Sequence, residues 1–113
     1  MVTPKFVRKH VSEVRAVAVD FGAVLDSGEL LTGTPTVTEA TGGVTLGSKA
    51  VNTGSITVNG RTVITGQAVQ FTITGGTAGT EYTVVVTCGT NATPAQTLIE
   101  VLRFKVIADT AQE

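Results

Sequence analysis

The sequence predicts an all-β fold, and three observations carry that prediction. The 113 residues are 42% hydrophobic but only 4% aromatic, with no Trp, so Val, Ile, Leu and Ala must supply the core. Val and Thr recur throughout, and their branching at Cβ favours strands over helices. The 13 glycines provide the positive φ angles that tight hairpin turns need. Between such turns lie about seven or eight short segments in which apolar and polar residues alternate, as a β-sandwich requires.

The stretch Gly75–Cys88 is the clearest of these segments. A Gly/Thr turn leads into a strand in which Tyr82, Val84 and Val86 share one face. In immunoglobulin-like sandwiches, a Tyr near the start of a late strand often makes a corner hydrogen bond to nearby backbone. We therefore expect an all-β, immunoglobulin-like β-sandwich of about seven to eight strands with an N-terminal arm.

Alternation and turn chemistry place the remaining strands. Val69, Phe71 and Ile73 alternate with polar residues, so we expect them in the core. Pro35 lacks the N–H that a central strand needs, so its strand is expected at a sheet edge. The Asn59-Gly60 pair tolerates the type I′ turn and predicts a hairpin. The principal further strands are expected over Val14–Phe21, Thr34–Ala40, Gln67–Thr74 and Thr97–Ala108.

The chain is expected to divide into an arm (Met1–Glu13), a sandwich domain (residues 14–108) and a polar tail (Asp109–Glu113). The arm is basic, and Pro4 argues against an early helix. We expect the arm to be extended and to dock on a partner, with a solvated, partly disordered terminus as the alternative. The candidate partner-binding residues are Lys5, Phe6, Arg8, Lys9 and His10.

Residue patterns that would indicate catalysis or a metal site are not found in the sequence, and no cofactor is expected. His10 has no carboxylate or nucleophile at motif spacing. Cys88, the single cysteine, has no partner for an intrachain disulfide and is expected to be a small buried hydrophobe. Asp20, Asp26 and Glu29 could bind Ca²⁺, but their spacing matches no EF-hand loop and turn capping explains them more simply.

The net charge of −1 predicts neither a nucleic-acid partner nor a membrane partner. No apolar run approaches the roughly 20 residues of a spanning helix. The N-terminus has charges where a signal peptide is apolar, so we expect synthesis in the cytoplasm without secretion. The low charge suggests either that neighbouring molecules cover part of the surface or that the surface is simply rich in Thr.

The order of motifs resembles small tailed-bacteriophage proteins described as fiber–tail adaptors. The resemblance covers roughly Val14 to Ile107, and Phe21 stands where a Trp is expected. The last turn, Gly89–Gln96, lacks the charged residues expected there. The motifs are Val19-Asp20-Phe21, Leu25, Ser27-Gly28-Glu29, the Thr/Val hairpins, Gly75–Cys88 and Leu102–Ala108, with Pro4-Lys5 near the N-terminus.

This resemblance implies a virion structural protein that is not an enzyme and is present in several copies. It would join the tail or neck to fibers through strand edges, loops and the arm. Its partners would be tail or neck, fiber or capsid subunits and further copies of itself, made in the host cytoplasm. A capsid decoration or cement protein of the same fold is an alternative. A carbohydrate- or surface-binding module is another, although it would ordinarily present more aromatic residues.

Overall fold

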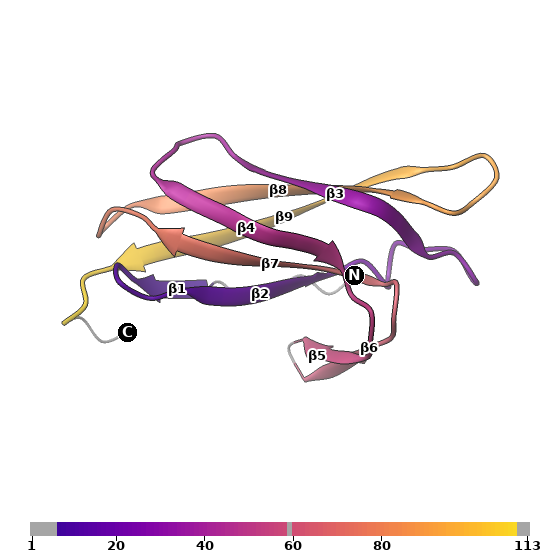
Figure 1. Ribbon diagram of the computed structural model, residues 1–113, viewed down its shortest axis with the longest axis horizontal. Helices are drawn as coiled ribbons and strands as arrows, with labels where there is room; N and C mark the ends of the chain where they lie inside the picture. The colour runs from indigo at the N-terminus through magenta and orange to yellow at the C-terminus, as the bar shows by residue number, and fades with distance from the viewer. Residues whose placement is uncertain (1–6, 59, 111–113) are drawn as a thin grey trace.

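The computed structural model describes residues 7–58 and 60–110. This part of the chain contains strands joined by turns and loops, and it contains no helix (Figure 1). The all-β prediction is therefore confirmed. One sheet has the order β1-β9-β8-β3, a second has the order β2-β7-β4, and β5 and β6 form a separate hairpin. The strands are β1 (Val7–His10), β2 (Arg15–Asp20), β3 (Leu31–Glu39), β4 (Val44–Val51), β5 (Ile56–Val58), β6 (Arg61–Val63), β7 (Ala68–Gly75), β8 (Glu81–Thr90) and β9 (Thr97–Ile107).

The main core lies between the two larger sheets. Both sheets contribute alternate side chains to this core. Val69, Phe71 and Ile73 of β7 are buried, as their alternation predicts. Val84 and Val86 of β8 are fully buried as well. A sandwich built in this way needs few aromatic residues, because branched aliphatic side chains fill the space between sheets.

Tyr82 forms the predicted corner at the start of β8. Its hydroxyl accepts a hydrogen bond of 2.9 Å from the backbone N–H of Thr77, in the preceding turn. Its ring stacks on Phe104 with 5.2 Å between the ring centroids. The hydrogen bond predicted from the sequence is thus confirmed, while an immunoglobulin-like topology stays a prediction.

β3 and β4, which lie next to each other, are irregular edge strands of the two larger sheets. β3, with Pro35, is the outermost strand of its sheet, as expected, and its register with β8 shifts between Thr32 and Thr36. The register of β4 with β7 shifts between Gly47 and Ala50. Such irregularities, like proline, hinder the pairing of an edge strand with another chain.

The structure differs from the expected arm at Val7–His10, which forms strand β1 and pairs in parallel with Phe104–Ile107 of β9. Lys9 points inward and is fully buried. Its ammonium group donates to the backbone carbonyl oxygens of His10, Val11 and Gly75 at 2.8–3.0 Å. The sequence predicted a basic arm, docked on a partner or solvated, because a buried lysine with three carbonyl acceptors cannot be recognised from neighbouring residues alone.

Candidate interaction surfaces

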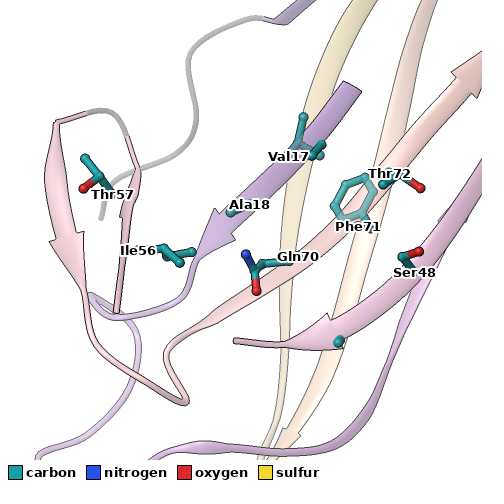
Figure 2. A pocket seen from close by; sticks show the side chains of 10 residues that line it. Val17, Ala18, Ser48, Ile56, Thr57, Gln70, Phe71 and Thr72 are labelled. Carbon is teal, nitrogen blue, oxygen red and sulfur yellow. The ribbon is translucent and has the colours of Figure 1, made fainter. Parts of the chain in front are cut away.

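An open groove of about 420 Å³ lies on the outer face of the three-stranded sheet (Figure 2). Its floor consists of small side chains on β2 and β4, and Gln70 and Thr72 of β7 lie between them. Ile56 of β5 reaches toward the sheet and forms a wall at one end. The small residues on β2 and β4 are Ala16, Ala18, Ser48 and Ala50. A partner side chain could therefore enter close to the backbone of the sheet.

The β5–β6 hairpin that forms this wall is held by an ion pair of which only the carboxylate is buried. The carboxylate of Asp20, at the end of β2, accepts a short hydrogen bond from the exposed Arg61 of β6. The second oxygen of Asp20 accepts from the backbone N–H of Gly22 at 2.7 Å. A Cβ at Gly22 would lie 3.0 Å from both Asp20 and Arg61, so glycine permits this close packing. The pair fixes the hairpin against the end of β2.

The buried Asn52 fixes the base of the same hairpin. Its side-chain oxygen accepts hydrogen bonds from the backbone N–H groups of Gly66, Gln67 and Ala68 at 2.9–3.1 Å. Its amide nitrogen donates to the carbonyl oxygens of Gly54 and Ile64, each at 2.9 Å. One side chain thereby joins the segments before β5 and after β6. The sequence pattern did not single out Asn52.

The outer face of the four-stranded sheet has a different character. Ile99 and Val101 of β9 are 60% and 42% exposed, and Val85 of β8 lies opposite Val101 in the register. Farther along β9 the same face carries Arg103 and Lys105. A small apolar strip thus merges into a basic region. Exposed apolar residues that lie next to one another are typical of contact surfaces.

A family model described as the podophage GP4 fiber-tail adaptor protein gp77 matches residues 9–99 of the chain. This match extends from β1 into β9 and includes the groove and the hairpin. The chain belongs to this fiber-tail adaptor family. The resemblance inferred from the sequence is therefore confirmed, and the protein is a structural component of a phage tail. No curated protein and no solved structure matches the chain.

In this member of the adaptor family, the predicted partner-binding residues occupy different environments. Lys5 and Phe6 lie outside the described residues. Arg8 is exposed on β1, and His10 is half-buried with its ring nitrogen 3.4 Å from a carboxylate oxygen of Glu13. Lys9 is buried, and desolvation lowers the pKa of its ammonium group. Lys9 therefore stabilises the fold by hydrogen bonds inside the protein. Partner binding by Lys5, Phe6, Arg8 and His10 stays a prediction.

Two of the three acidic residues considered for Ca²⁺ cap turns in this family member, and the third, Asp26, accepts a hydrogen bond of 3.2 Å from the side-chain amide of Gln96. A carboxylate oxygen of Asp20 accepts from the backbone N–H of Gly22 at 2.7 Å. A carboxylate oxygen of Glu29 accepts from the backbone N–H of Asp26 at 2.9 Å. That hydrogen bond is the main reason why the pKa of Glu29 is lowered. Across residues 7–58 and 60–110, no group of three His, Cys, Asp or Glu residues could hold a metal ion.

Cys88 is buried on β8, and its thiol donates to the carbonyl oxygen of Thr32 at 3.6 Å. Burial raises the pKa of the thiol, so the reactive thiolate is disfavoured. The expected role of Cys88 as a small buried hydrophobe is consistent with this environment.

Within the described ranges, no helix is long and apolar enough to cross a membrane.

Proposed function

We propose that this chain links the tail or neck of a phage to its fibers through protein–protein contacts, without catalysis. The observation that carries the proposal is the match to the fiber-tail adaptor family over residues 9–99. The match covers most of the sandwich, including strands of both sheets. Several copies would act together in the particle, each in contact with other virion proteins.

The geometry of the two sheets supports this proposal. An adaptor must hold two partners at once, which requires two separate surfaces. The sandwich offers the groove on the outer face of β2-β7-β4 and the apolar and basic strip on the outer face of β1-β9-β8-β3. These faces lie on opposite sides of the shared core, so two partners could bind without competing.

The edge of β2 adds a contact region beside the groove. Among the described strands, β2 is outermost in its sheet, and its register with β7 is unbroken from Arg15 to Asp20. It contains neither Pro nor Gly, in contrast to the irregular β3 and β4. A regular edge strand can add a strand from a partner, and the groove beside it could receive alternate side chains of that strand.

Virions produced without this protein test the proposed role. Electron microscopy should show intact, filled heads that lack fibers, because the link between tail and fiber is missing. Unstable or incomplete heads with fibers still attached would instead favour the capsid decoration alternative and contradict the adaptor role. Six-, three- or twelvefold rings of the protein near the tail would agree with the adaptor role, whereas trimers at the three-fold points of the capsid would oppose it.

Variants in the groove separate binding from folding. Ala16→Arg and Ala50→Arg place a long charged side chain at exposed positions of the groove, and Thr45→Arg is a matched control on the same sheet face outside it. We expect the two groove variants to keep the melting temperature of the purified protein but to produce virions with fewer fibers. Normal fiber numbers in both variants would show that the groove is not a contact surface.

A further inference from the structure

The outer face of the four-stranded sheet combines apolar and basic residues in one continuous surface. Ile99 and Val101 stand two residues apart on β9, so both side chains point away from the core. Across the register, Val101 lies opposite Val85 and Ile99 lies opposite Thr87 of β8. The surface therefore has an apolar centre that water covers in the isolated chain.

Cations gather at one end of this apolar centre. Arg103 and Lys105 follow on the same face of β9, and Arg8 of β1 lies directly beside Lys105 in the register. On β1, β8 and β9 as described, the carboxylate of this face is Glu81, opposite Lys105. Arg103 lies opposite Thr83 rather than opposite a carboxylate. Carboxylates on a partner would therefore complement the excess of positive charge at this end of β9.

We propose that this face docks on a different virion protein, whose contact surface places apolar side chains over Ile99 and Val101 and carboxylates against Arg103 and Lys105. Protein interfaces commonly have such an apolar centre with a charged rim, and complementary charge orients the partner. A second copy of this chain that presents the same face fits less well, because on the described β1, β8 and β9 that face offers only the carboxylate of Glu81 to Arg103 and Lys105. Bare nucleic acid would leave the apolar centre without a contact.

The proposal deepens the proposed function and rests on it, because it describes one of the two partners of the adaptor. Its principal charges are independent of the family match, which ends at residue 99 and so excludes Arg103 and Lys105. The proposed face also lies opposite the groove, so it concerns a different contact from the one tested by the groove variants.

Charge and apolar variants in phage test the proposal. Ile99→Asp disrupts the apolar centre, and the double variant Arg103→Glu with Lys105→Glu reverses the basic end. Ile64→Asp is a matched control because Ile64 is 52% exposed but lies beyond β6. Lys49→Glu, at an exposed site of β4, controls for the change of charge. All variants are first compared with the unmodified protein in thermal unfolding, so that misfolding is recognised.

The expected result is a drop of at least tenfold in copies of this protein, or in fibers, per virion for both test variants, with both controls near the normal value. In addition, a zero-length carboxyl–amine cross-linker applied to normal virions should join Lys105 to an Asp or Glu of another virion protein. Lys105→Arg, which keeps the charge, should lose the cross-link and keep the fibers.

Two outcomes would overturn the proposal. Normal virions from both test variants would show that the face contacts no partner. A cross-link from Lys105 to another copy of this chain would identify the occupant as a second copy. A test variant that fails only because it unfolds would be replaced by Val101→Asn or Arg103→Gln, and normal virions from those would have the same meaning. Failure of the adaptor role itself is recognised separately, since virions without this protein would then keep their fibers.

Discussion

At the scale of single residues, buried polar side chains fix the parts of the chain that strand pairing leaves unconnected. Asn52 is the clearest case, because its side chain forms hydrogen bonds with five backbone groups. Three of these are N–H groups that share one acceptor oxygen. A buried N–H group without an acceptor costs about 1–3 kcal/mol, so the loss of a shared acceptor is expensive.

Replacing Asn52 should therefore reduce stability strongly. We expect Asn52→Ala to lower the free energy of unfolding by roughly 3 kcal/mol, because five side-chain hydrogen bonds are lost together, although the N–H groups of Gly66 and Gln67 keep backbone acceptors. Thr53→Ala, at an exposed neighbouring position, should change it by less than about 0.5 kcal/mol. Urea unfolding of the purified proteins measures both values. Equal stability of the two variants would show that water or rearranged backbone replaces the Asn52 amide.

Residues also show which parts of the structure the sequence could predict. Tyr82, Phe71 and Ile73 were placed correctly, because alternation and a preceding turn are local signals. Asn52 was not singled out, because three of its acceptor contacts involve residues 14–16 positions later in the chain. Lys9 was placed in a basic arm, although a carbonyl 66 positions away accepts from it. Nonlocal hydrogen bonds of this kind leave no periodic pattern.

At the scale of elements, β1 is fastened to the end of β9 by hydrogen bonds from the following turn. The carboxylate of Asp109 accepts from both the backbone N–H and the hydroxyl of Ser12, at 3.0 and 2.6 Å. Glu13 accepts from the backbone N–H of His10 at 2.9 Å. These hydrogen bonds lower the pKa values of both carboxyl groups, since they favour the charged forms.

This arrangement predicts that the attachment of β1 weakens in acid. A carboxyl group with a lowered folded pKa stabilises the fold above its ordinary pKa, 3.8 for Asp109, and that contribution is lost as the pH falls through the folded pKa. We expect Asp109→Ala to lower the melting temperature more at about pH 6 than at about pH 2.5.

Thermal unfolding of the unmodified protein and the variant at both pH values measures the difference. Thr110→Ala, next to Asp109 and exposed, is the control and should have no pH-dependent effect. A deficit of the Asp109→Ala variant that is equally large at both pH values would contradict the prediction, because it would show that the carboxylate charge does not matter.

The same scale explains why the sites were harder to predict than the fold. The groove forms on one face of the sheet, where the small residues Ala16 and Ala18 of β2 and Ser48 and Ala50 of β4 flank the central strand β7. Each pair is unremarkable within its own segment. Only the sheet order brings them together, and single-sequence patterns do not specify that order. The basic end of β9, in contrast, could be recognised as exposed from alternation alone.

At the scale of the whole molecule, the chain is an elongated sandwich of 48 × 27 × 21 Å whose N-terminal strand is part of a sheet. A detachable arm over Met1–Glu13 would contribute nothing to the stability of the domain. In the structure, however, β1 pairs with the edge of β9 at Phe104–Ile107 and buries Lys9 between the sheets. Removing β1 would expose that edge and leave the carbonyl oxygens around Lys9 without their donor.

Two truncations distinguish these possibilities. Both the chain without residues 1–6 and the chain without residues 1–10 lack Lys5 and Phe6, so their difference isolates β1. We expect the shorter chain to melt about 5 °C or more below the longer one, because it loses a strand and the buried ammonium group that donates to the carbonyl oxygens of Val11 and Gly75. Equal melting temperatures would show that β1 is dispensable for folding and would favour the arm. If the chain without residues 1–6 folds normally but no longer enters virions, Lys5 and Phe6 lie in a segment that binds a partner, whereas normal incorporation would place the contacts on the sheet faces and edges.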